Sequence, residues 1–294
     1  MSKRFDIRIL KNQVFELQKK AFGKGLNSIG FFSPELSSKL AIYFFTKTRF
    51  NKVRQRSPFS TKDPLKYTLD GQELALYQFG QGKRTLLVHG WEGQASDFFK
   101  LIEPLIESGH EVWAFDGPGH GGSSGNSSNV FEFVDIIRKL NEKFGPFDYG
   151  IGHSMGGVAL GLASETRDFN PQKIVTMGSP NKFENILKAF SSSIGLSKKI
   201  ETTLIDQIEK KLGRKLSEVS VEKAVSNSDT EFLIVHDSDD KWVPFESAEA
   251  IAAQNENSEL YKSQGLGHFK ILRDEQTITK MMNFFNTDKG LSRG

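Results

Sequence analysis

The sequence contains no cysteine and no long apolar run. The first absence excludes a thiol nucleophile, a disulfide framework, a cysteine-ligated zinc ion and an iron–sulfur cluster. The apolar run at 41–45 is far too short to cross a bilayer. Charged residues interrupt the apolar ones throughout the first 20 positions, so we do not expect a secretory signal. The default expectation is a cytoplasmic protein.

Charge is distributed unevenly along the 294 residues. Residues 1–66 hold 15 Lys and Arg against 4 Asp and Glu, a net charge of +11, whereas the remaining 228 residues carry a net charge of −8. Phenylalanine is abundant, and nine of the 25 lie in the same basic segment. The length suffices for one large α/β domain with a proper core, or at most two small ones. The basic, aromatic-rich segment therefore needs an explanation of its own.

From residue 65 onward, strand-like and helix-like apolar segments alternate, which predicts a mostly parallel sheet flanked by helices. We expect an eight-stranded sheet. Its strands are predicted at 67–69, 74–79, 85–89, 111–115, 149–152, 173–177, 232–236 and 260–263. Helices are predicted at 95–107, 130–144, 155–166 and 276–285.

The alternation stops between Pro180 and Asp229, where Ile200, Leu204, Ile208 and Leu212 recur at helical spacing. This predicts a small helical cap inserted over one edge of the sheet. The alternative is a long decorated crossover with no role over a site. The predicted organisation is a helical extension at 1–64, a core at 65–180 and 229–294, and a cap at 181–228.

The segment 152–156 reads Gly-His-Ser-Met-Gly and lies between a predicted strand and a predicted helix. A reactive serine needs a very tight strand-to-helix turn that projects its Oγ from the carboxyl end of the sheet. Side chains at either flanking glycine would collide with neighbouring backbone. Ser154 is therefore the candidate nucleophile, against the simpler possibility of a plain glycine-rich turn.

When a serine attacks a carbonyl carbon, the oxyanion of the tetrahedral intermediate needs two N–H donors to stabilise it. The helix that starts after Ser154 offers the N–H of Met155, and the loop after the strand at 85–89 offers that of Trp91. Gly90 lets this loop approach a substrate closely. The alternative for Trp91 is aromatic packing at the mouth of a pocket, and both roles can hold together.

A serine hydroxyl also needs a general base and a carboxylate that orients it. His268, in a glycine-rich loop after the last predicted strand, suits the base, whereas His110 is expected in a surface turn. Three carboxylates follow the strand at 232–236, namely Asp237, Asp239 and Asp240. Local reasoning does not separate these three.

The motifs occur in an order that resembles the α/β-hydrolase fold superfamily, in its branch of capped serine esterases and lipase-like enzymes. The resemblance covers about residues 65–288 and implies that the acid is the residue before x-x-Val-Pro, which is Asp240. The family usually has glycine where this chain has Asp237, so Asp237 and Asp239 stay open as alternatives. The matching segments are 89–91, 116–121 with Ser123, 152–157, 240–244 and 267–268.

The expected function is a serine hydrolase that cleaves carboxylic esters of small apolar substrates through Ser154, His268 and Asp240. It would use no cofactor and no metal. Alternatives are a monoacylglycerol or lysophospholipid lipase, a thioesterase or a carbon–carbon bond hydrolase on the same triad, and a non-catalytic binding protein of this fold. The sequence has no recognisable nucleic-acid reader, so nucleic acid is not an expected partner.

Two hypotheses cover the basic segment. Its helices dock their apolar faces on the acidic body, or residues 1–64 make peripheral contact with anionic membranes.

Overall fold

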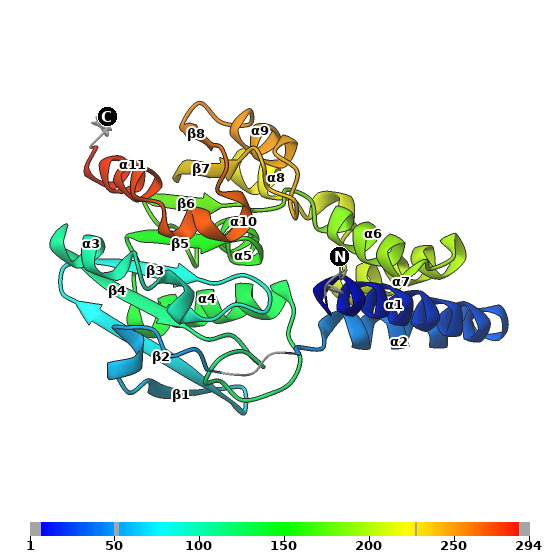
Figure 1. The fold of residues 1–294 in the computed structure, drawn as a ribbon. Coiled ribbons are helices and arrows are strands. Elements are labelled where there is room, and N and C mark those ends of the chain that lie inside the picture. Colours follow the sequence, from blue (N-terminus) through cyan, green and yellow to red (C-terminus); the bar gives the residue numbers. More distant parts are fainter. Residues whose placement is uncertain (1–6, 50–52, 227, 288–294) are drawn as a thin grey trace, which may run out of the picture. The chain divides into compact units, whose positions relative to one another are not determined.

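The computed structural model describes residues 7–49, 53–226 and 228–287, which form two compact units (Figure 1). The first, called here the helical unit, combines the residues up to 47 with 183–219. The second, called the α/β unit, combines residues 48–182 with the residues from 220 onward.

The α/β unit is built on an eight-stranded sheet with the order β1-β2-β4-β3-β5-β6-β7-β8 (Figure 1). The β1–β2 and β2–β4 pairs are antiparallel and the other pairs are parallel, which confirms the predicted mostly parallel sheet. The strands are β1 Leu65–Leu69, β2 Gln72–Gly80, β3 Lys83–Val88, β4 His110–Phe115, β5 Tyr149–His153, β6 Lys173–Met177, β7 Glu231–Asp237 and β8 Ser258–Ser263.

Local chemistry explains the strands. β1 and β2 join through Asp70 and Gly71, whose φ angles of 49° and 81° are both positive, as a tight two-residue hairpin turn demands. Every residue of β5, β6 and β7 is buried, which agrees with continuous apolar runs covered on both faces. β8 is an edge strand and is largely exposed.

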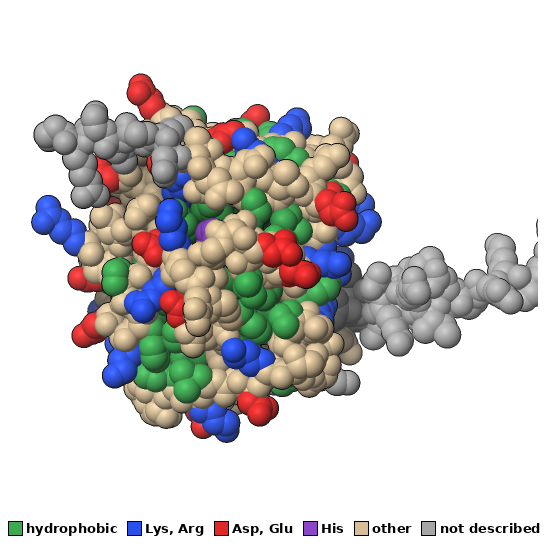
Figure 2. Space-filling view, turned by 90° about the vertical axis from the view of Figure 1, so that its left-hand side faces the viewer, with side chains coloured by type: hydrophobic (Ala, Val, Ile, Leu, Met, Phe, Trp, Pro, Cys, Tyr) green, Lys and Arg blue, Asp and Glu red, His purple; other side chains and the backbone are tan. Residues whose placement is uncertain are grey.

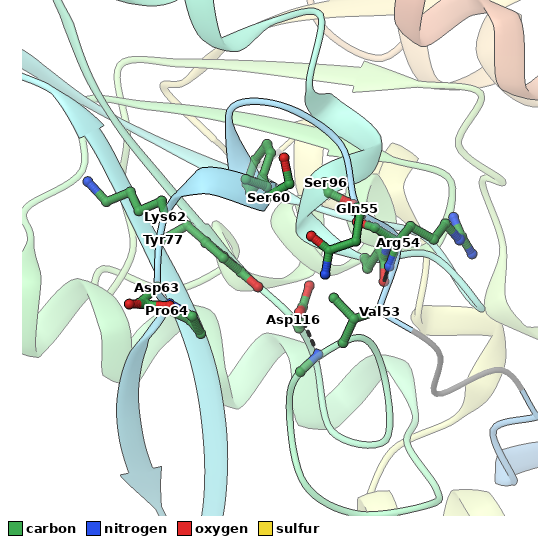
Figure 3. Close-up of a pocket in the computed structure, with 13 residues that line it drawn as sticks. Val53, Arg54, Gln55, Ser60, Lys62, Asp63, Pro64, Tyr77, Ser96 and Asp116 are labelled. Atoms are coloured by element: carbon green, nitrogen blue, oxygen red, sulfur yellow. Dashed lines mark hydrogen bonds between the residues drawn. The ribbon is translucent and has the colours of Figure 1, made fainter.

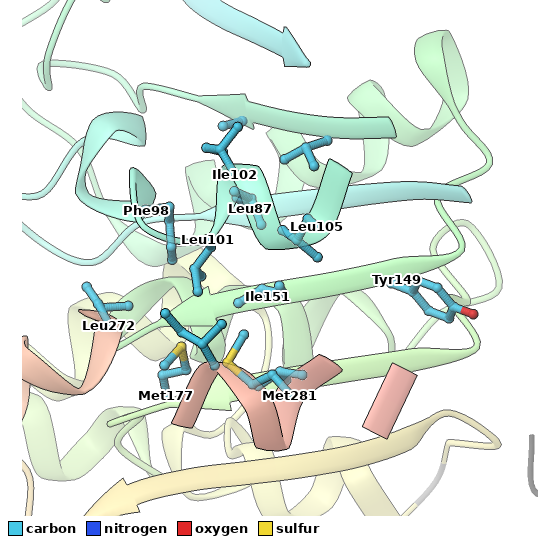
Figure 4. Packing of buried hydrophobic residues seen from close by; sticks show 14 of the residues in the cluster. Leu87, Phe98, Leu101, Ile102, Leu105, Tyr149, Ile151, Met177, Leu272 and Met281 are labelled. Atoms are coloured by element: carbon cyan, nitrogen blue, oxygen red, sulfur yellow. The ribbon is translucent and has the colours of Figure 1, made fainter. Parts of the chain in front are cut away.

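Helices cover both faces of the sheet. On one face, α3 (Ile102–Glu107) and α11 (Glu275–Asn286) pack with the 3₁₀ helix η4 (Ile271–Arg273) over a large apolar cluster (Figure 4). On the other face lie α4 (Val130–Phe144) and α5 (Met155–Ala163). The remaining elements of this unit are η1 (Phe59–Thr61), η2 (Ala95–Phe98), α8 (Val221–Ser226), α9 (Glu246–Ala252) and α10 (Gly267–Lys270).

Two sequence-based expectations were wrong. The helix predicted at 95–107 is split into η2 and α3. A continuous helix would need an N–H at position 104 to bond the carbonyl of residue 100, and Pro104 has no N–H. His110 is not in a surface turn: its ring is buried, and Nδ1 lies 2.7 Å from the Thr85 hydroxyl oxygen. The first residue of β4 faces the core there, against Tyr149 and Phe285.

The helical unit pairs two N-terminal helices with the inserted ones. It contains α1 (Ile7–Phe32), α2 (Pro34–Thr46), α6 (Phe183–Ile194), α7 (Lys198–Leu212) and η3 (Leu216–Glu218). α2 packs on α1 and α7, and α1 also contacts α6. Leu26, Ala41 and Leu204 are buried inside, and the Ser37 hydroxyl donates to the Leu26 carbonyl at 2.7 Å. Within this unit, the N-terminal helices thus pack on the inserted helices.

The face shown in Figure 2 carries acidic and basic side chains interspersed, with apolar side chains between them. None of the helices in the described ranges is long and apolar enough to cross a membrane.

Candidate active site

Ser154 lies in a strained turn between β5 and α5. Its φ of 52° and ψ of −120° lie in a backbone region that residues with a Cβ rarely adopt. A Cβ on Gly156 would clash with the carbonyl oxygen of Val88, and one on Gly152 would lie 2.5 Å from the Gly157 nitrogen. The two glycines therefore permit the turn, as the motif predicts.

The loop after β3 runs directly beside this serine. A Cβ on Gly90 would lie 2.9 Å from the Cβ of Ser154, so only glycine fits. Among the described residues, no acceptor is found for the N–H of Trp91. Met155 is the first residue of α5, where backbone N–H groups have no partner inside the helix. The loop and the helix N-terminus can thus present N–H groups near Ser154.

Two histidines hold this loop in place. His89 Nε2 accepts the N–H of Gly117 at 2.9 Å, and His120 Nε2 accepts the N–H of Glu92 at 3.1 Å. Both rings must be unprotonated at Nε2 to accept. Burial is the main cause that lowers the pKa of His120 to about 4 and that of His89 well below its ordinary value.

The Asp116 carboxylate also holds this loop through hydrogen bonds. It accepts the N–H of Ala95 at 2.7 Å and that of Gly122 at 2.8 Å. Burial raises its pKa to about 6. A cavity of about 220 Å³ lies beside it, lined partly by Arg54 and Tyr77 (Figure 3). Ser154 and His268 do not line this cavity, which lies behind the loop rather than at the candidate site.

A cluster of ion pairs also holds the loop that carries Trp91, and the sequence did not predict it. Arg54 Nη1 contacts both carboxylate oxygens of Asp97, at 2.6 and 2.9 Å, and Arg56 Nη1 lies 2.5 Å from one of them. Arg54 Nη2 also donates to the Glu92 carbonyl at 2.7 Å. Part of the basic excess before residue 66 therefore pairs with the loop that carries Trp91.

The structure pairs His268 with Asp240. Nδ1 of His268 lies 2.7 Å from Oδ2 of Asp240, and the Asp240 side chain is 1% exposed. Its Oδ1 accepts the N–H groups of Trp242 and Val243. Burial alone would raise the pKa of Asp240, but the hydrogen bonds from His268 and the two N–H groups outweigh it and lower that pKa. With Nδ1–H donating, Nε2 of His268 keeps its lone pair.

His153 joins the serine turn to the histidine loop. Its Nε2 lies 2.9 Å from the His268 carbonyl oxygen and donates to it, and the two rings lie 4.8 Å apart. The N–H of Ser154 donates to the carbonyl oxygen of Met177 at 2.9 Å, and Gly178 is the next residue after Met177 in the chain. A Cβ on Gly178 would lie 3.2 Å from Nδ1 of His268. Ser154, Asp240 and His268 are therefore gathered at the carboxyl ends of β5, β6 and β7.

Asp237 and Asp239 bind backbone instead of a histidine. The buried Asp237 carboxylate accepts the N–H groups of Gly267 at 2.9 Å and Leu266 at 3.0 Å, and the Ser263 hydroxyl at 2.8 Å. Asp239 accepts the N–H of Gly265. Burial would raise the pKa of Asp237, but these hydrogen bonds outweigh it and lower the pKa. Asp237 thus anchors the loop that leads into His268.

The chain is similar in sequence to known hydrolases. Residues 85–197 match the model of the alpha/beta hydrolase family. The chain has the fold of the α/β-hydrolase superfamily. Over 36% of its length it is 34% identical to a human serine hydrolase-like protein, of which the match covers 58%. It is also 39% identical over 100 residues to polyneuridine aldehyde esterase of Rauvolfia serpentina. This match covers 32% of this chain and 36% of that esterase. The chain thus spans less than two thirds of these curated relatives.

The likeness to solved structures concerns the α/β-hydrolase fold alone. The esterase Est1E of Butyrivibrio proteoclasticus, solved with ferulic acid, has a TM-score of 0.56 at 21% identity and covers 75% of this chain and 97% of that one. In chain order, the candidate residues run serine, acid, histidine, as is typical of α/β-hydrolases. Within the ranges that the structure describes, no group of three or more His, Asp or Glu side chains could hold a metal ion.

The buried histidines make stability depend on pH. Burial lowers the pKa of His120 and of His153 to about 4, while an unfolded histidine titrates near its ordinary 6.5. Between these two pKa values the unfolded chain therefore binds more protons, so the folded state loses stability as the pH falls. From pH 7 to pH 5 the two histidines should remove about 3 kcal/mol, of which about 1 kcal/mol is offset by Asp116, whose raised pKa acts oppositely.

Urea unfolding at both pH values measures this change, and His120→Gln should make the pH dependence shallower. An unfolding free energy that stays level or rises toward pH 5 would contradict the neutral, buried state of these rings.

The anchoring role of Asp237 can be separated from that of its neighbour. Asp237→Asn places an amide N–H₂ among four donors, the three above and the N–H of Asp239, and we expect a loss of about 2 kcal/mol in unfolding free energy. Asp239→Asn disturbs one exposed acceptor and should cost less than about 0.5 kcal/mol. Chemical denaturation of both variants measures the difference. Equal stabilities would show that the Asp237 contacts contribute little.

Proposed function

We propose that the protein is a serine hydrolase that cleaves carboxylic esters of apolar substrates. Ser154 is the nucleophile, His268 the general base and Asp240 the acid that orients it. The observation that carries the proposal is the 2.7 Å contact between His268 and Asp240 at the sheet edge where the strained turn presents Ser154.

The reaction follows from these positions. Nε2 of His268 takes the proton of the Ser154 hydroxyl as its Oγ attacks the ester carbonyl, while the N–H groups of Trp91 and Met155 stabilise the resulting oxyanion. The imidazolium, stabilised by Asp240, then gives its proton to the leaving alcohol, and an acyl-serine remains. Water attacks this ester with His268 as base again, which releases the carboxylic acid and restores the serine.

Two exposed aromatic side chains beside His268 favour an apolar substrate. Trp242 is 73% exposed and Phe269 is 52% exposed. Their rings lie 6.3 Å and 5.0 Å from the His268 ring and 6.0 Å from each other. Large apolar side chains at such a position can cover the acyl or alcohol part of an ester. This pair therefore supports esters with an apolar chain as the substrate class.

The nucleophile is tested with Ser154→Ala. We expect kcat for p-nitrophenyl butyrate to fall by about 10⁴-fold, because the covalent path is lost. The matched control is Ser179→Ala, since the buried Ser179 hydroxyl has no hydrogen-bond partner among the described residues. This control should stay within about threefold of the wild type. A Ser154→Ala variant that folds normally and keeps most of its turnover would contradict the proposal.

The aromatic pair is tested with a series of p-nitrophenyl esters of increasing acyl length. Trp242→Ala and Phe269→Ala should each lower kcat/KM for octanoate esters by about tenfold, because apolar contact area is lost. Acetate esters, which cannot reach far along the pair, should change by less than about twofold. An equal loss for short and long esters would assign these residues to the catalytic geometry instead of chain binding.

A further inference from the structure

The helical unit carries a net positive charge, whereas the rest of the chain is net negative. Residues 1–47 and 183–219 hold 16 Lys and Arg against 8 Asp and Glu, a net charge of +8, while the rest of the chain has a net charge of −5. The basic excess thus includes the inserted helices as well as the N-terminal ones. This charge is a property of one compact unit.

An apolar tip stands out on this unit where α1 meets α2. Phe31 is 81% exposed and Phe32 is 87% exposed, and their rings contact edge to face at 5.2 Å. The turn is well defined: the Ser33 side chain accepts the N–H of Leu36, and Pro34 starts α2. Leu36 is itself 52% exposed. A tight helical turn therefore presents three large apolar side chains to solvent.

Lysines share the outer face of α1 with this tip. Leu17, Lys20, Lys24 and Phe31 follow one another at intervals of three, four and seven residues, which places them along one side of the helix. Leu17 is 66% exposed, and both lysines lie in exposed positions. The opposite side of α1 supplies the buried Leu26. The exposed apolar residues are therefore not part of the packing inside the unit.

α2 repeats the arrangement. Leu36, Lys39, Tyr43 and Lys47 recur at intervals of three and four, and Tyr43 is 52% exposed. The Lys47 ammonium donates to the Tyr43 hydroxyl at 3.2 Å. Residues 17–47 contain five lysines and one acidic residue, Glu35. Apolar side chains with lysines beside them are complementary to an anionic lipid surface. There the apolar side chains can contact acyl chains and the lysines can contact the anionic headgroups.

We propose that this face of the helical unit, formed by Leu17, Phe31, Phe32, Leu36 and Tyr43 with the lysines around them, binds the surface of an anionic phospholipid membrane. The two phenylalanines enter the headgroup region, and Lys20, Lys24 and Lys39 contact the phosphates. Charge decides between this occupant and a second copy of the chain, because two such faces would bring their lysines together. The binding is independent of the proposed hydrolysis.

The experiment uses the full chain and co-sedimentation with vesicles of phosphatidylcholine alone or with roughly 30% phosphatidylserine. At about 0.1 M salt we expect partitioning to be at least about tenfold stronger on the anionic vesicles, and weaker at about 0.5 M salt. Phe31→Ser combined with Phe32→Ser should lower partitioning by about tenfold or more. Lys20→Gln, Lys24→Gln and Lys39→Gln together should have a similar effect.

The matched control is Leu65→Ser combined with Ile106→Ser, which removes two exposed apolar side chains from the α/β unit. It should partition as the wild type does, and thermal unfolding confirms that each variant is folded. The proposal is overturned if anionic vesicles bind no better than neutral ones, or if the control loses as much as the phenylalanine variant. It is also overturned if light scattering shows that the tip holds a dimer together instead.

Discussion

The backbone turn at Ser154 is the constraint on which the rest of the site depends. A residue with a side chain occupies a φ of 52°, and neighbouring backbone approaches so closely that Gly90 and Gly156 are required. Such a conformation persists only when the surroundings hold it. Here the N–H of Ser154 bonds to β6, and the adjacent His153 bonds to the backbone of His268. The turn that exposes the serine is thereby tied to the loop that carries the candidate base.

Buried polar side chains hold the loops around this turn. Neutral His89 and His120, together with Asp116, bind the loop that carries Trp91, and Asp237 binds the loop before His268. A buried group with its partners in place confers a single geometry, but it loses that advantage when its protonation changes. The acid sensitivity expected for the fold is therefore a consequence of how the site is positioned.

The sequence predicted much of this architecture because its signals are local. Continuous apolar runs identify the central strands, and the glycine spacing around Ser154 identifies the turn. The missed features depend on distant partners. Nothing near Asp237 indicates that loop N–H groups will converge on its carboxylate, and nothing near Arg54 points to Asp97, 43 residues away. The packing of α1 on α6 likewise joins segments more than 150 residues apart. The triad assignment stays a prediction, drawn from motif order and from the contact between Asp240 and His268.

Whether Ser154 is the activated nucleophile of this site is tested most directly by a mass measurement. After reaction with a fluorophosphonate, intact-protein mass spectrometry should give one adduct per chain, and peptide mapping should locate it on Ser154. The Asp240→Asn variant should form the same adduct far more slowly, because the base is no longer held in the productive tautomer. No adduct, or an adduct on another residue in the folded protein, would contradict the account.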